Sequence, residues 1–314
     1  MRNKVNTPIR TLAIFIGSLL SCVLTPGVAA QDQDFRDLGR GYAHLISFEA
    51  EPEIAAAWFT VDNNDESLSD SDISTTKLPL YKEFESDQHE WRWFAQGAVS
   101  YMTYEESLYI EEIFERRESL TPKYTAYGGL LEGGVIMPLS NGFSLAPSLG
   151  LGVSSLENET KFSNPLIEDM LPPNARGQFY DWDTLASVAR GHLALLYDQE
   201  HGSFRLKGSA HLSYSYIDSF HESTDFQGFH NHSSTFTLKL DVRHPLNVSV
   251  REHPLFIIGH LGNTTFLGSG RDELGFSYFN ELGISLGVES VAIGIMGLLG
   301  DDVDGWSLTF NYDY

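Results

Sequence analysis

The sequence predicts an all-β fold, a transmembrane antiparallel up-and-down β-barrel of about twelve strands formed by residues 53–314. Apolar residues alternate with small or polar residues, with a period of two, in segments of about ten residues. The connections between these segments alternate between short turns and long acidic loops. Residues 1–30 have the three parts of a secretory signal peptide. Together these observations predict an exported chain that crosses a membrane with strands.

The predicted signal peptide begins with three basic residues among its first ten positions. An apolar run follows at residues 12–24, and it is shorter than the roughly 20 residues that a membrane-spanning helix needs. Val28 and Ala30 are the small residues that a signal peptidase recognises, which predicts cleavage after Ala30. A lipoprotein signal ending at Cys22 is a weaker alternative, because bulky Leu20 precedes it and the residues after it are still apolar.

The composition excludes some classes of function. The chain has 43 Asp and Glu against 20 Lys and Arg, so it lacks the cationic surface that binds nucleic acid. Hydrophobic residues make up 42% and aromatic residues 12%, which is too much for a disordered chain. Cys22 is the single cysteine, so we expect the mature chain to contain no thiol. Beyond the signal, no window of the sequence is apolar enough to be a membrane-spanning helix.

Between the signal and the first strand, residues 31–52 form a separate segment. Apolar residues between positions 34 and 50 allow either a short helix that plugs the barrel lumen or a strand-like periplasmic extension, and the sequence does not choose between them.

The clearest strand is at residues 143–154, where Phe143, Leu145 and Leu149 lie on one face and Ser144, Ser148 on the other. The weakest is at residues 76–84, which is included because bacterial barrels have an even number of strands. The predicted strands cover residues 54–61, 76–84, 91–104, 124–137, 143–154, 182–197, 204–216, 236–243, 255–265, 281–288, 291–300 and 305–314.

The connections predict two different rims. The short connections are rich in Asn, Gly, Pro and Ser, and the long ones are polar and mostly acidic. We therefore expect both termini at the periplasmic rim and the acidic loops outside the cell. The short links are residues 140–142, 198–203, 245–254 and 289–290, and the long loops are residues 62–75, 105–118, 157–181 and 219–233.

A soluble exported β-sandwich is the alternative fold for such strands. A sandwich would place fewer glycines opposite its apolar face and would not sort its loops by length, whereas Gly, Ser and scattered charges here suit a wet barrel interior. Aromatic residues near strand ends suit the interfacial girdles of a membrane barrel. They include Trp91, Trp93, Tyr101, Tyr104, Tyr214, Tyr216, Trp306, Tyr312 and Tyr314.

The last strand has apolar or aromatic residues at every second position, namely Leu308, Phe310, Tyr312 and Tyr314. This pattern resembles the assembly signal of Gram-negative outer-membrane β-barrels, which implies recognition by the barrel-assembly machinery. The layout of the whole chain is similar to the translocator barrel of autotransporters, and most similar to the solitary autotransporter-type barrels that carry no passenger. The resemblance implies a place in the cell outer membrane, with membrane lipid and lipopolysaccharide as partners and no cofactor.

Several charged residues fall on the small-residue face of the predicted strands. They form either an electrostatic filter that selects solutes or a set of opposed charges that satisfy one another, and we favour the second. In either case they should avoid lipid, where Arg or Lys costs about 2 to 4 kcal/mol at the midplane. The predicted lumen-facing residues are Arg92, Glu132, Arg190, Arg205, Lys207, Lys239, Asp241, Arg243 and Glu281.

His232 and Ser234 are the residues that suggest nucleophilic chemistry, because a His and a Ser two positions apart share a strand face. This spacing resembles that of outer-membrane phospholipases and lipid A deacylases. Those phospholipases have Asn-Gly directly after the serine, whereas Thr235 and Phe236 follow here, and no third orienting residue stands out. We therefore expect a non-enzymatic narrow channel or structural surface protein, with the lipid hydrolase as the alternative.

Metal binding is not expected. Three histidines, His221, His230 and His232, lie close together in the sequence, but histidines in a loop are usually only solvated. Acidic residues within the ranges 62–72 and 105–118 offer ligands for divalent cations that bridge lipopolysaccharide, although such charge runs are most often hydrated surface.

Overall fold

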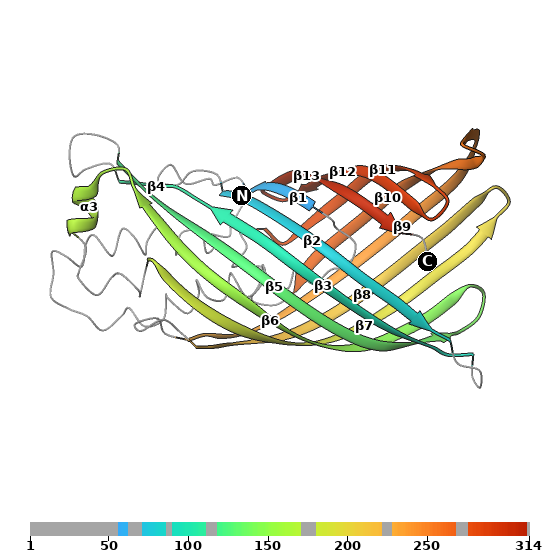
Figure 1. Cartoon of the computed structure of the whole chain (residues 1–314), viewed down its shortest axis with the longest axis horizontal. Coiled ribbons are helices and arrows are strands. Elements are labelled where there is room, and N and C mark those ends of the chain that lie inside the picture. Colours follow the sequence, from blue (N-terminus) through green and yellow to red (C-terminus); the bar gives the residue numbers. More distant parts are fainter. Residues whose placement is uncertain are drawn as a thin grey trace, which may run out of the picture.

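The structure is a computed structural model, and it describes residues 56–61, 71–85, 90–110, 118–170, 180–221, 228–267 and 276–312. Within them the chain forms one antiparallel sheet that closes on itself as a barrel of 12 strands (Figure 1). Consecutive strands pair along the chain, except that β3 pairs with β5, and the pairing of β1 with β13 joins the two ends of the sheet. β4 continues the line of β3 alongside β5. The predicted fold class is confirmed.

The strands of the first half are β1 (Ala56–Val61), β2 (Ser71–Phe84), β3 (Arg92–Glu105), β4 (Leu108–Ile110), β5 (Glu118–Pro138), β6 (Phe143–Phe162) and β7 (Trp182–His201). Those of the second half are β8 (Phe204–Phe220), β9 (His230–Val250), β10 (His253–Leu267), β11 (Tyr278–Val288), β12 (Val291–Gly300) and β13 (Val303–Tyr312). One short helix, α3 (Pro165–Met170), follows β6 at the long-loop end of the barrel (Figure 1). No helix in the described part of the chain is both long and apolar enough to span a bilayer.

All twelve predicted strands are present, but several are longer than predicted. β2 begins at Ser71, β6 continues to Phe162 and β9 begins at His230, so each extends into a region predicted as a long loop. The predicted link at residues 245–254 is wrong, because β9 continues to Val250 and the link is a two-residue turn. Polar strand ends lie beyond the membrane, where hydrophobic alternation is not required, and the sequence pattern therefore does not mark them.

The short turns have backbone conformations that fix the hairpins. Asn141 and Gly142 between β5 and β6 have φ of 56° and 81°, as a type I′ turn requires. Arg251 and Glu252 between β9 and β10 have φ of 51° and 75° without a glycine. The first turn agrees with the Asn-Gly signal in the sequence, whereas nothing in Arg-Glu indicates the second.

The outer wall is apolar. Leu131 of β5 and Leu149 of β6 are 75% and 76% exposed, and apolar side chains at alternate positions are exposed on strands all around the barrel. A soluble protein does not leave a continuous apolar surface of this extent in water, so the soluble sandwich interpretation is wrong and lipid covers this face.

The interior is not polar throughout, which differs from the prediction. Near the long loops the inward-facing side chains form one apolar cluster of buried residues, which includes Phe59, Met102, Trp182, Phe266 and Phe279. Polar residues occupy the middle of the lumen. Tyr104, predicted in an outer girdle, faces inward instead, where its hydroxyl donates to Glu106 Oε2 at 3.1 Å. A smaller apolar cluster lies near the turn end of β3, β5, β6 and β7.

Gly142→Ala should destabilise the barrel by about 1 to 3 kcal/mol, because a non-glycine residue is strained at positive φ and the added methyl group has no room. Its Cβ would press on Gln199 Cγ and lie 2.9 Å from the Asp198 carbonyl oxygen. Gly202→Ala is the matched control, since Gly202 has φ of 64° but nothing within 4 Å of the added Cβ. Urea unfolding in lipid vesicles measures both. Equal losses would show that crowding against Gln199 and Asp198 is unimportant.

Candidate functional site

All nine charged residues that the sequence places on the small-residue face lie at inward-facing positions of the barrel wall. Glu132, Arg190 and Glu281 are buried, whereas the others are partly exposed and Arg92 is exposed. Arg92 donates to Glu83 Oε2 at 2.7 Å, and Arg205 makes two bonds of 2.8 Å to the two carboxylate oxygens of Asp198. These surroundings support mutual satisfaction of opposed charges.

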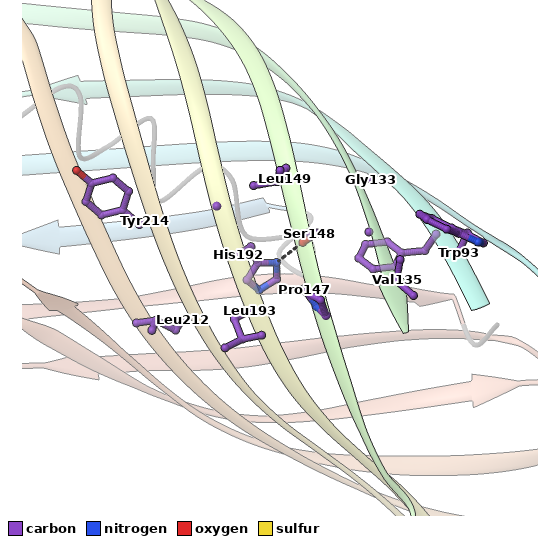
Figure 2. Close-up of a pocket in the computed structure, with 13 residues that line it drawn as sticks. Trp93, Gly133, Val135, Pro147, Ser148, Leu149, His192, Leu193, Leu212 and Tyr214 are labelled. Carbon is purple, nitrogen blue, oxygen red and sulfur yellow. Dashed lines mark hydrogen bonds between the residues drawn. The ribbon is translucent and has the colours of Figure 1, made fainter. Parts of the chain in front are cut away.

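A connected polar cluster in the described part of the lumen centres on His192 of β7. Its Nδ1 lies 2.9 Å from Glu132 Oε1, and its Nε2 lies 3.0 Å from His211 Nδ1. Ser148 Oγ donates to the same Glu132 oxygen and lies 3.4 Å from His192 Nδ1 (Figure 2). Arg190 Nη1 lies 3.9 Å from the other Glu132 oxygen. We call Glu132, Ser148, Arg190, His192 and His211 the His192 network.

A glycine lies between the carboxylate of Glu132 and the guanidinium of Arg190, which come from strands on either side of β6. Gly150 of β6 lies between Glu132 of β5 and Arg190 of β7 in the sheet register. A Cβ at Gly150 would lie 3.3 Å from Glu132 Cβ, so the missing side chain makes room for the carboxylate. Gly262 likewise lies between Lys239 of β9 and Glu281 of β11, and its Cβ would lie 2.6 Å from Glu281 Oε2.

A second polar chain crosses β9, β10, β11 and β13. His260 Nδ1 lies 2.7 Å from Asp241 Oδ1, and His260 Nε2 lies 2.7 Å from Ser285 Oγ. Ser285 Oγ also lies 3.2 Å from Thr309 Oγ1. The order acid, histidine, serine is that of a hydrolytic triad. However, Ser285 is only 1% exposed, so a substrate carbonyl cannot approach its oxygen. These hydrogen bonds instead connect the inner faces of β9, β10, β11 and β13.

His232 and Ser234 both lie on the outer face of β9. His232 Nδ1 is hydrogen-bonded to the Tyr214 hydroxyl, and its ring packs 5.1 Å from that of Tyr216. These contacts resemble an aromatic girdle more than an activated nucleophile. His221 directly follows β8, and His230 is the first residue of β9. No group of three or more His, Cys, Asp or Glu residues in the described ranges has the geometry of a metal site.

Sequence reasoning missed several residues of these networks. His192, His211 and His260 are polar residues on the inward parity of strands predicted correctly, so the alternation could have identified them. Lys77 of β2 is also buried and inward-facing, but it lies in the weakest predicted strand. Residues 1–55, with the predicted cleavage site and plug, and Tyr314 lie outside the described residues. Leu308 and Phe310 face outward.

A closed antiparallel barrel with an apolar outer wall and polar networks inside defines an integral outer-membrane β-barrel protein. A sequence model for the solitary outer membrane autotransporter β-barrel domain matches residues 57–314, and the chain belongs to this family. It therefore has an autotransporter-type translocator barrel and lies in the outer membrane of a Gram-negative cell.

Among solved structures, the chain is similar to the β domain of the Bordetella autotransporter BrkA, with 12% identity, a TM-score of 0.46, and coverage of 84% of this chain and 100% of that one. It is similar to the transport unit of AIDA-I from Escherichia coli, with 11% identity, a TM-score of 0.48, and coverage of 89% and 99%. It is also similar to the translocator domain of the autotransporter NalP from Neisseria meningitidis, with 12% identity, a TM-score of 0.48, and coverage of 87% of this chain and 93% of that one. No curated protein sequence matches the chain.

Glu132→Ala should lower the free energy of unfolding by about 3 to 5 kcal/mol, because it leaves Arg190 buried without this carboxylate. Glu132→Gln should cost less, since an amide oxygen still accepts a hydrogen bond from Ser148. Glu157→Ala is the control, because Glu157 is exposed and its loss should change stability by no more than about 0.5 kcal/mol. Urea unfolding in vesicles measures all three. Similar values for Glu132→Ala and Glu157→Ala would contradict a stabilising His192 network.

Proposed function

We propose that this barrel is a non-enzymatic surface protein of the outer membrane whose lumen is closed near the long loops. The observation that supports this function is the apolar cluster inside that end of the barrel. An open diffusion channel lines its lumen with polar groups, because water must fill it. The proposal therefore favours a structural role over a narrow channel.

The contacts within the cluster extend beyond neighbouring strands. Phe59 of β1 and Phe279 of β11 have ring centroids 6.0 Å apart, although β12 and β13 lie between these strands in the sheet. Phe279 also packs against Phe266 of β10 at 6.3 Å. Phe266 and Phe279 are each 1% exposed. Such packing excludes water from its part of the lumen.

The lipid hydrolase is the less supported function. It requires a serine that is activated by histidine and open to substrate. Among the described residues Ser234 is not hydrogen-bonded to His232, whose Nδ1 is engaged by the Tyr214 hydroxyl. Ser285 is hydrogen-bonded to a histidine, but it is buried and closed to substrate. We infer from the same family assignment that the short turns, the start of β1 and the end of β13 face the periplasm, with the long acidic loops outside.

Planar-bilayer conductance tests the closed lumen. The wild-type protein should show no steady conductance, and Phe59→Ala combined with Phe279→Ala should open a channel because it removes two large rings that fill the lumen between β1 and β11. Leu282→Ala on the outer face is the control and should leave the protein closed. A steady wild-type conductance that the double variant does not change would contradict the proposal. If deletion of residues 34–50 opens the lumen and the double variant does not, that segment closes it instead.

Deletion of Tyr314 tests the proposed recognition by the barrel-assembly machinery. We expect at least about a tenfold lower yield of folded barrel in the outer membrane, with the chain accumulating in the periplasm, because the terminal aromatic residue of the signal is gone. Fractionation followed by electrophoresis of unheated and heated samples measures folded and unfolded protein. Asp313→Ala is the control, since it keeps Tyr314 and the apolar alternate positions. Normal yield after the deletion would exclude this signal.

A further inference from the structure

The lipid-facing wall between β3 and β8 contains an apolar groove of about 720 Å³ (Figure 2). Its sides are outward-facing side chains from four strands, and they are all exposed. The volume falls in the range of about 300 to 1,000 Å³ that is usual for small-molecule sites. The side-chain walls of the groove are Trp93, Leu149, Leu193, Leu212 and Tyr214.

The groove exists because two outward-facing positions have no side chain. Gly133 of β5 and Gly191 of β7 both line it. A Cβ at Gly133 would have its nearest neighbour, the Phe94 carbonyl oxygen, at 3.9 Å, and a Cβ at Gly191 would lie 3.9 Å from Leu149 Cδ2. Both positions therefore have room for a side chain that the sequence does not supply.

The β5–β6 ladder is also interrupted beneath the groove. Residue pairs are continuous up to Gly134 and Ser148 and resume in the same register at Met137 and Leu145, so two pairs are missing. Pro147 lies in this gap and has no N–H group to donate to the ladder. Proline is rare inside a paired strand, and here it lines the groove.

Through this thin part of the wall the groove reaches the polar interior. Ser148 and His192 line it from behind, and both belong to the His192 network (Figure 2). The groove thus has an apolar mouth, and its floor is formed by the buried residues Phe94, Ser148 and His192.

Most of the groove lies in the half of the wall nearer the short turns, and its other end reaches the middle of β8 at Leu212 and Tyr214. Trp93 is the second residue of β3, Gly133 and Val135 lie close to the end of β5, and Leu149 lies close to the start of β6. These strand ends are joined or flanked by short links. In a bacterial barrel the short turns are periplasmic, so the groove faces the periplasmic leaflet.

We propose that this groove binds one acyl chain of a phospholipid from the periplasmic leaflet. An apolar lining inside the hydrocarbon belt selects a hydrocarbon chain, and the position near the short turns selects phospholipid over the lipopolysaccharide of the outer leaflet. The proposal goes beyond the proposed function, since it requires the barrel to lie in the membrane but not the lumen to be closed.

Photocrosslinking in nanodiscs tests the site on the wild-type protein. The probe is phosphatidylethanolamine with a diazirine on one acyl chain, and crosslinked peptides are mapped by mass spectrometry. We expect crosslinks concentrated on the groove strands β3 and β5 to β8. Lipid A with the same diazirine forms the second arm. In asymmetric vesicles that confine it to the leaflet at the long-loop end, it should not label the groove.

Groove-filling variants test whether the missing side chains create the site. Gly133→Leu and Gly191→Leu together should reduce groove crosslinks by about tenfold, as expected when a side chain occupies an apolar pocket. Gly297→Leu of β12 is the matched control, because it is outward-facing and its Cβ would also have its nearest neighbour at 3.9 Å. Electrophoresis of unheated and heated samples verifies folding, and native mass spectrometry counts retained phospholipids and protein copies.

The proposal is overturned by wild-type crosslinks spread evenly around the barrel, by stronger groove labelling from lipid A, or by equal effects of the groove and control variants. It is also overturned if the groove variants convert a dimer to a monomer without changing lipid retention, because a second copy of the chain would then occupy the groove. The wild-type crosslinking map decides the question even if the double variant does not fold.

Discussion

Hydrocarbon cannot hydrogen-bond with the backbone, and the whole structure follows from this constraint. Each strand must have partners on both sides, so the sheet has to close, and β1 pairs with β13 while β3 pairs with β5. Closure fixes one face toward lipid and one toward the lumen, which explains the period-two sequence. The interruption at Pro147 is an exception within a β5–β6 ladder that is otherwise continuous for many residues.

The residues that fill the barrel interior differ along the barrel axis. Near the long loops, apolar side chains such as Phe59 and Phe279 fill space without polar groups that need partners. In the middle, buried Glu132 is hydrogen-bonded to His192, and Gly150 leaves room for the Glu132 carboxylate between β5 and Arg190 of β7.

Much of the fold could be predicted because the lipid face imposes a strict pattern. Leu282, Ile284 and Leu286 alternate with small residues and identify β11 without help from tertiary contacts. The ends of β6 and β9 could not be predicted, because beyond the membrane nothing requires alternation. The same limit applies to Tyr104, since an aromatic residue near a strand end fits both an outer girdle and an inner cluster.

The sequence predicted that some residues of the candidate site face inward, but it did not predict which residues are in contact. Parity placed Glu132 and Arg190 on the inward face, but it could not show that His192 and His211 join Glu132, since that depends on register between β5, β7 and β8. The groove was hidden for a similar reason, because its glycines and Pro147 come from different strands. Sequence patterns within a strand report which face a residue occupies, and pairing between strands determines what it touches.

Lipid covers one face of every strand, and spin-label accessibility tests this arrangement most directly. Single cysteines at residues 282 to 287 of β11 can carry the label, because Cys22 is the single natural cysteine and lies in the predicted signal. In vesicles, collision with dissolved oxygen should be high for labels at Leu282, Ile284 and Leu286 and low at the alternate positions. Equal accessibility at all six positions, or preferential collision of the outward labels with a water-soluble nickel complex, would contradict the account.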